Sequence, residues 1–194
     1  MAVDSATMLA LFAITIVGLI VMFLVTTTYN DVISLRIRID KAWANIDVVL
    51  RQRFDQLPAL VDAVRGQMAF ERDVLEEVTA RRADYRPAAG IPSQAVVSEA
   101  TTVAVQRLLG VVESYPVLKS NENVLALQGE ISRLEQLLAA RRELYNDQVL
   151  RYNTRIAQVP TSFMAGLLDW EPRPFFKAGP DVAAVPDTSL APGA

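Results

Sequence analysis

The amino-acid sequence predicts an all-α fold, in which an N-terminal transmembrane helix is followed by an antiparallel, four-helix-type bundle of long helices. The first observation is that no charged residue occurs between Ser5 and Asn30. The second is that apolar residues recur at steps of three and four along most of the remaining chain, which is the period of an amphipathic helix. The third is that no segment alternates apolar and polar residues as a half-buried strand does.

Residues 8–25, with the sequence MLALFAITIVGLIVMFLV, form the predicted membrane span. About 20 apolar residues are needed for a helix to cross a hydrocarbon core of ~30 Å. A cleaved signal peptide would instead need a basic N-terminal region, a shorter apolar core and a small-residue cleavage site. Asp4 is the only charged side chain ahead of this run. We therefore expect residues 1–28 to hold an N-terminal segment and one transmembrane helix.

Three basic residues, Arg36, Arg38 and Lys41, lie just after this span. Cytoplasmic segments that flank a membrane helix are enriched in Lys and Arg. The sequence therefore favours a single-pass protein of the cell (inner) membrane, with its N-terminus outside and its domain in the cytoplasm.

The first soluble helix is predicted to continue from the membrane. Its apolar face is expected to consist of Leu35, Ile39, Ala42, Ile46 and Val49. Pro58 is the first strong interruption, because proline removes a backbone donor and its ring clashes with the preceding turn. We expect the helix to kink or break near Gln56 and Leu57, and residues 59–85 to form a second long helix or a kinked extension.

Residues 86–93 (RPAAGIPS) predict a connection, because two prolines and a glycine lie close together. A third helix is predicted over Gln94 to Glu113. The last long helix is predicted over Asn123 to Val159, where apolar steps of three and four continue for about 35 residues, or ~50 Å. Such a helix needs other long helices beside it, with coiled-coil-like packing, to cover its apolar face.

Pro160 should end this helix, and residues 161–168 could form one more short turn. The bundle domain is therefore expected over residues 29–168. Residues 169–194 are rich in Pro, Ala and Gly without a period, which predicts an extended, largely disordered C-terminal tail.

Composition excludes several classes of function. The chain has 194 residues and a formal net charge of -3, which argues against nucleic acid as a partner because phosphate binding needs a clustered basic face. It contains no cysteine and no histidine, so His-Glu zinc hydrolases and Ser-His or Cys-His acyl transfer are excluded. A membrane hydrolase could use only carboxylates or Ser and Lys, and no spacing supports either. We expect no enzymatic activity, no cofactor and no metal.

Several side chains are candidates for structural or interaction roles. Trp43 could be a recognition aromatic, but a large residue beside an apolar stripe is more often packed inside. Asp47 and Arg141 either line a binding cleft or form an interhelical ion pair that fixes the register of two helices, and the ion pair is favoured. Tyr145 and Tyr152 are seven residues apart on one helix face, which favours packing over chemistry.

The segment from Pro172 to Phe176 (PRPFF) combines Arg173 with two aromatic residues, Phe175 and Phe176. It either folds back onto the bundle or contacts a membrane or a neighbouring subunit. Folding back is the favoured interpretation.

A set of short motifs covers roughly residues 29–176. The first group is Tyr29-Asn30, Ala42-Trp43, Ile46-Asp47-Val48, Leu50, Arg53, Asp55, Leu57-Pro58, Leu60-Val61, Val64, Gly66 and Glu71. The second group is Tyr115-Pro116, Leu118-Lys119, Asn121, Asn123, Leu127-Gln128, Glu135, Ala140-Arg141-Arg142, Tyr145-Asn146, Tyr152-Asn153, Pro160, Ala165-Gly166-Leu167 and Pro172. With these motifs the sequence resembles the LemA family of bacterial membrane proteins.

The resemblance implies an N-terminal membrane helix with a short external N-terminus, a compact four-helix bundle and no enzymatic activity. It also implies roles in membrane-associated assembly or signalling, sometimes beside membrane-embedded proteases or in building intracellular membrane compartments. Arg53, one of the matching positions, joins the candidate structural or interaction residues. Two positions depart from the family pattern. Phe70 stands where many members carry a histidine before Glu71, and Asp169-Trp170 replaces the usual glycine-aromatic pair.

The leading functional hypothesis is a non-enzymatic scaffold tethered to the lipid bilayer, which forms a homo-oligomer or binds another membrane protein such as a membrane protease. Confinement to a bilayer raises effective concentration, so a weak contact between bundles is sufficient for assembly. The alternative is a sensor or adaptor that passes a ligand-driven change through the anchor helix, and it predicts a pocket within the bundle.

Overall fold

A computed structural model describes residues 5–68, 71–87 and 89–177, and every regular element in these ranges is a helix. The all-α prediction is therefore confirmed. The helices are α1 (Ser5–Arg65), α2 (Arg72–Asp84), α3 (Ile91–Val112), α4 (Pro116–Lys119), α5 (Glu122–Ala157) and α6 (Thr161–Leu167).

Helix α1 continues through Pro58 without a break, and the chain turns only at Gly66. The prediction of a break near Gln56 and Leu57 is wrong. The helix predicted over residues 59–85 is instead divided, because α1 runs to Arg65 and α2 begins at Arg72. Phe54 and Leu57 before the proline and Val61 after it are all buried, with at most 3% of each side chain exposed. Burial of apolar surface on both sides of Pro58 outweighs the loss of one backbone hydrogen bond, because each buried side chain contributes roughly 1.5–3 kcal/mol.

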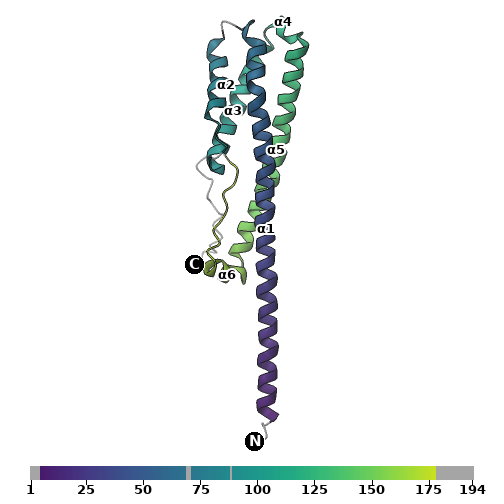
Figure 1. Ribbon diagram of the computed structural model, residues 1–194, viewed down its shortest axis with the longest axis vertical. Coiled ribbons are helices and arrows are strands. Elements are labelled where there is room, and N and C mark those ends of the chain that lie inside the picture. The colour runs from purple at the N-terminus through teal and green to yellow at the C-terminus, as the bar shows by residue number, and fades with distance from the viewer. Residues whose placement is uncertain (1–4, 69–70, 88, 178–194) are drawn as a thin grey trace, which may run out of the picture.

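Helices α1, α2, α3 and α5 lie alongside one another in the upper part of the molecule (Figure 1). The chain rises along α1, descends along α2, rises along α3 and descends along α5. Ion pairs agree with the antiparallel course of α1 and α5, since Asp31 near the start of the packed part of α1 pairs with Arg155 near the end of α5, at 2.8 Å. Arg107 of α3 pairs with Glu77 of α2 at 3.0 Å.

The predicted apolar stripes form the core between α1 and α5. All five residues of the α1 stripe are buried. The stripe on α5 is buried from Val124 to Ile156 except at Leu127, which is half-buried, and it ends before Val159, which is 73% exposed. The buried members on α5 are Val124, Ile131, Leu134, Leu138, Tyr145, Val149, Tyr152 and Ile156. The apolar residues that recur at steps of three and four in the sequence are therefore the residues that pack between α1 and α5.

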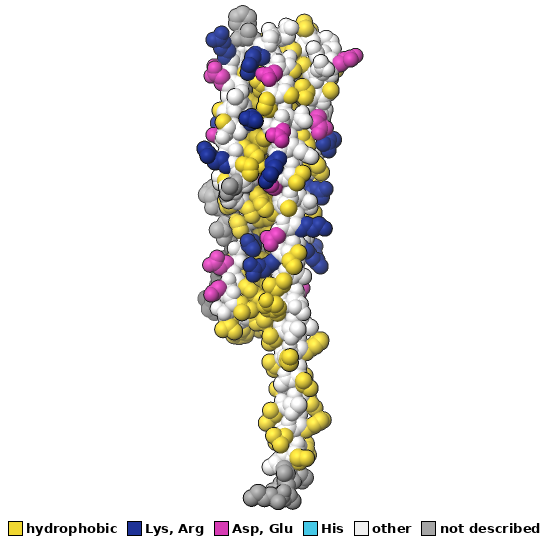
Figure 2. All heavy atoms as spheres, viewed as in Figure 1, with side chains coloured by type: hydrophobic (Ala, Val, Ile, Leu, Met, Phe, Trp, Pro, Cys, Tyr) yellow, Lys and Arg dark blue, Asp and Glu magenta, His cyan; other side chains and the backbone are white. Residues whose placement is uncertain are grey.

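Residues 7–27 of α1, here called the stem, project from one end of the bundle, away from the other described helices (Figures 1 and 2). The large apolar side chains between Met8 and Val25 are 40–71% exposed. Packing begins at Thr28, which is 5% exposed. Exposure of such a long apolar surface to water is unfavourable. The stem is therefore suited to an apolar environment.

Among the described residues, two helices are long and apolar enough to cross a membrane, judged by length and composition alone. They are α1 and α3. Helix α3 lies within the bundle and has eight buried residues, among them Ala104, Val105 and Leu108. The apolar residues of α3 therefore belong to the core of the bundle, whereas those of the stem do not.

Residues 170–177 follow α6 and are extended, as the sequence predicts for this region, but they lie ordered against the bundle. The ordered domain therefore reaches beyond residue 168. The rest of the predicted tail, residues 178–194, and Phe70 lie outside the described residues.

Candidate functional site

An extended strap, residues 170–176, is bound to one face of α5 by side chains that hydrogen-bond to its backbone. Asn153 donates to the carbonyl oxygen of Arg173 at 3.0 Å and accepts from the amide of the same residue at 2.8 Å. Asn146 likewise donates to the carbonyl oxygen of Phe176 at 3.4 Å and accepts from the amide of Phe176 at 2.8 Å. Each asparagine thus satisfies both backbone groups of one strap residue.

Two tyrosines add a second set of contacts with the same spacing. The hydroxyl of Tyr152 donates to the carbonyl of Glu171 at 3.1 Å, and that of Tyr145 donates to the carbonyl of Pro174 at 2.8 Å. Seven residues of α-helix advance about 10.5 Å, and three extended residues advance about 10 Å. A Tyr-Asn pair repeated after seven residues on α5 therefore meets every third residue of the strap.

Aromatic contacts hold both ends of the strap. Phe176 is fully buried, with its ring 5.9 Å from that of Trp43 and 5.1 Å from the guanidinium of Arg142. Trp43 also meets the ring of Tyr145 edge-on at 6.0 Å. At the other end, the Trp170 ring lies 5.9 Å from that of Tyr29.

The remaining strap side chains are less covered. Arg173 and Phe175 are half-buried, and the ammonium group of Lys177 lies 5.9 Å from the Phe175 ring. Trp43 is half-buried and packs against the core. One site therefore brings together six of the candidates that the sequence offered for structural or interaction roles, namely Trp43, Tyr145, Tyr152, Arg173, Phe175 and Phe176.

Burial raises the pKa of Tyr145 to about 12, and Arg173 opposes this shift while Asp40 adds to it. The folded protein therefore keeps the phenol proton to a higher pH than the unfolded chain, whose tyrosines titrate near pH ~10. The resulting stabilisation is complete below pH ~10 and is lost as the pH rises towards 12, by about 2–3 kcal/mol in total. Urea unfolding at several pH values should show this decline, and Tyr145→Phe should remove its share of the slope. An identical slope in the variant would contradict the assignment.

The turn between α6 and the strap is strained at Asp169, whose φ is 50°. This is the left-handed region, which glycine adopts freely and residues with a Cβ adopt at a penalty of about 1–2 kcal/mol. The turn is closed by the amide of Trp170, which donates to the carbonyl of Ala165 at 2.9 Å.

Asp169→Gly is therefore expected to raise the free energy of unfolding by up to about 1 kcal/mol, and Asp169→Val to lower it by about 1–2 kcal/mol. Both changes can be measured by urea denaturation monitored by circular dichroism. A glycine variant less stable than the original chain would show that the aspartate side chain contributes more than its backbone strain removes.

A second polar site lies inside the bundle around Arg53, whose side chain is fully buried. Its Nη2 lies 2.5 Å from Glu135 of α5 and donates to the Thr102 hydroxyl of α3 at 2.9 Å, and Nη1 donates to the Ser98 carbonyl at 3.1 Å. Burial lowers the pKa of Arg53, and the charges of Glu135 and Glu99 oppose this shift. One guanidinium thus joins three helices.

Asp47 and Arg141 do not meet. Asp47 pairs with Arg51, one turn further along α1, at 2.7 Å and accepts a hydrogen bond from the Tyr85 hydroxyl at 3.3 Å. Arg141 is half-buried and forms no ion pair within the described part of the chain. The predicted Asp47–Arg141 pair is wrong because Asp47 faces the end of α2 rather than α5.

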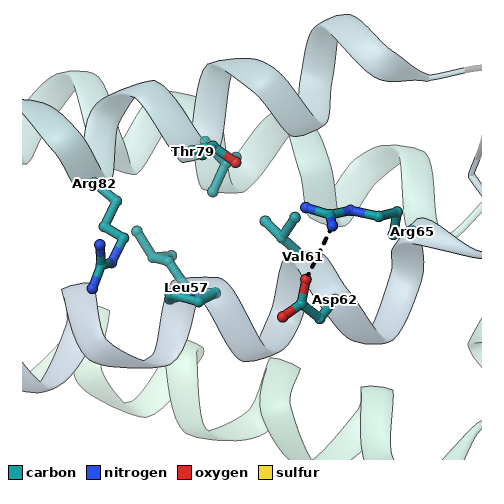
Figure 3. A pocket seen from close by; sticks show the side chains of 8 residues that line it. Leu57, Val61, Asp62, Arg65, Thr79 and Arg82 are labelled. Atoms are coloured by element: carbon teal, nitrogen blue, oxygen red, sulfur yellow. Dashed lines mark ion pairs between the residues drawn. The ribbon is translucent and has the colours of Figure 1, made fainter.

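A cavity of about 310 Å³ lies between α1 and α2 at the end of the bundle far from the stem (Figure 3). Leu57, Val61 and Val78 are buried beneath it, and an exposed pair, Asp62 and Arg65 at 3.6 Å, stands at its edge. Its other lining residues are Pro58, Thr79 and Arg82. No motif in the sequence marks these residues as the lining of a cavity.

The described residues hold no cluster of three or more potential metal-ligating side chains. Of the sites described above, the strap site binds a peptide backbone and the Arg53 site compensates a buried charge. The cavity is lined by both apolar and charged side chains.

The all-helical fold and the exposed apolar stem define the class, which is a membrane-associated helical protein. Within this class the chain belongs to the LemA family, whose model matches residues 42–189. The resemblance inferred from the motifs is thereby confirmed.

Two relatives are magnetosome proteins MamQ 2 and MamQ 1 of Paramagnetospirillum magneticum strain AMB-1. Each is 30% identical to the chain over 77 residues, which make up 40% of this chain. The aligned stretch covers 28% of each relative, so the similarity concerns less than a third of those proteins.

Proposed function

We propose that the protein is a non-enzymatic, single-pass membrane scaffold, in which the stem crosses the bilayer and displays an antiparallel four-helix bundle that associates with other copies. The observation that carries the proposal is the continuity of α1, which has 61 residues and passes from the exposed stem into the core of the bundle. The 18 residues from Met8 to Val25 span about 27 Å as a helix, close to the ~30 Å of a hydrocarbon core.

Self-association is supported by apolar side chains on the surface of the bundle. Ile37 and Val48 of α1 are 62% and 53% exposed. They are 11 residues apart, about three helical turns, so they lie on the same face of the helix. Molecules confined to one bilayer meet at a high effective concentration, so a small apolar contact is sufficient for assembly. Similarity to proteins named for the magnetosome lends support to a role in a cellular assembly.

The native mass in a mild detergent tests this proposal. The expected result is a particle that contains two or more copies of the 21.4 kDa chain. The double variant Ile37→Lys with Val48→Lys should reduce the particle to one copy. Val103→Lys is the matched control, because Val103 is 56% exposed on α3. A strictly monomeric particle at all protein concentrations would contradict self-association. A reproducible membrane protein partner, such as a protease, in the same particle would redirect the proposal to hetero-association.

The orientation we propose places the N-terminus outside and the bundle in the cytoplasm. Arg38 and Lys41 are exposed on α1 just beyond the stem, where the positive-inside rule has its strongest influence. A reporter that folds only in an oxidising compartment, fused after Ala194, should stay inactive. An active reporter would reverse the orientation.

A sensor or adaptor is the second candidate, and the cavity between α1 and α2 favours it. Ligand in this cavity would touch Leu57 and Val61, which belong to the same helix as the stem. This candidate predicts a monomer whose stem mobility changes when a small molecule occupies the cavity. Thr79→Leu, which fills the cavity, should abolish that change in mobility. If the protein is a scaffold, the same variant should leave the native mass unaltered.

A further inference from the structure

The short helix α6 and the residues beside it expose large apolar side chains on the surface of the bundle. Leu167 is 82% exposed and Phe163 is 75% exposed, which are the two highest values among the described large apolar residues. Val159 and Leu168 are 73% and 42% exposed. The opposite side of α6 packs against the rest of the protein through Thr161, which is buried, and Ala165, which lies against the core. Phe163 and Leu167 therefore point away from the bundle.

This surface lies at the end of the bundle from which the stem projects (Figure 1). The contact between the rings of Trp170 and Tyr29 places α6 at this level along α1. Tyr29 lies two residues beyond the stem, and Trp170 lies three residues beyond the end of α6. Figure 2 shows hydrophobic side chains gathered at this end, next to the point where the stem leaves the bundle.

The level of α6 coincides with a membrane surface if the stem spans the bilayer. The apolar run of the stem ends at Val25, and Tyr29 lies about 6 Å further along the helix axis. Tyrosine and tryptophan are enriched at this depth, where the ring is apolar and the polar group reaches water. Side chains that project from α6 away from the bundle therefore meet the headgroup region.

We propose that α6 is a second membrane contact. In this proposal Phe163, Leu167 and Leu168 insert into the leaflet on the bundle side of the bilayer, next to the point where the stem emerges. The proposal rests on the membrane anchor proposed above. A surface helix with apolar side chains binds at the boundary of headgroups and acyl chains. Because α6 is packed on α5, this contact would seat the base of the bundle on the bilayer and limit its tilt about the stem.

The absence of cysteine in the sequence makes single-site labelling a direct test. An environment-sensitive fluorophore is attached to Leu167→Cys in the full chain, which is reconstituted in vesicles of phosphatidylcholine and phosphatidylglycerol. Matched labels are placed at Phe23→Cys near the end of the stem and at Val103→Cys on α3, which are 67% and 56% exposed. A second set of vesicles carries phosphatidylcholine spin-labelled near the top of its acyl chain.

The expected result is that the label at residue 167 emits at shorter wavelength and loses most of its intensity to the spin-labelled lipid, as the label at residue 23 does. The label at residue 103 should do neither. A quenched label at residue 23 with a solvated, unquenched label at residue 167 would overturn this inference and leave the anchor in place. An unquenched label at residue 23 would overturn the anchor itself. A blue-shifted but unquenched label at residue 167 would mean that protein covers α6, which also overturns the inference.

Discussion

Glu135→Ala is expected to lower the free energy of unfolding by about 3–5 kcal/mol, because it leaves a fully buried guanidinium without its counter-charge. Arg53 is 0% exposed, and Glu135 is the carboxylate that lies 2.5 Å from it. The hydroxyl of Thr102 and the carbonyl of Ser98 remain as partners, but neither carries a full charge. Urea unfolding monitored by circular dichroism measures the loss.

Two further variants separate the buried charge from a general effect on α5. Glu130→Ala removes an exposed ion pair with Arg133 on the same helix, and should change stability by less than about 1 kcal/mol. Arg53→Met combined with Glu135→Leu removes both charges, and should be more stable than Glu135→Ala alone. If Glu135→Ala and Glu130→Ala had equal effects, the Arg53 site would contribute no more than a surface pair.

Asn146→Ala combined with Asn153→Ala is expected to release the strap and to lower stability by about 2–4 kcal/mol, because four hydrogen bonds to backbone groups are lost. The local signature is more specific than the global one. The amides of Arg173 and Phe176 donate to the two asparagines, so their hydrogen exchange should approach that of an unfolded segment.

Asn123→Ala is the matched control, since Asn123 is an exposed asparagine in the first turn of α5. It should leave the exchange of both strap amides unchanged. If the strap amides stayed protected in the double variant, the aromatic contacts of Phe176 and Trp170 would be sufficient to hold the strap, and the asparagines would be incidental.

Periodicity in the sequence predicted most of the helices because long apolar stripes leave few alternatives. The stripes through Ile46 on α1 and Leu138 on α5 are buried as expected. Arg53 was harder to interpret, although a signal was present. It follows Leu50 by three residues and precedes Leu57 by four, so the apolar period places it in the core. The sequence could not reveal its partner, because pairing across helices depends on their relative register.

Local rules failed where tertiary packing opposes them. Pro58 normally marks a break, but the buried residues around it keep α1 continuous. The tail from residue 169 was expected to be extended and largely disordered because it has no apolar period. The favoured interpretation of residues 172–176, that they fold back onto the bundle, agrees with the strap that lies on α5. The order of the strap comes from backbone contacts that composition does not encode. The signal that could have revealed it was the Tyr-Asn pair repeated after seven residues, at Tyr145 and Tyr152.

The exposed apolar stem predicts that the chain is held in lipid. Membranes from cells that express the full chain should retain it after washing with alkaline carbonate, and a detergent should be required to release it. Phe12→Lys with Leu19→Lys places two charges on one face of the stem, each unfavourable by about 2.5–3.5 kcal/mol at the centre of a membrane helix, and should shift the chain towards the aqueous fraction. Quantitative recovery of the unaltered chain in the aqueous fraction would show that the stem is not held in lipid.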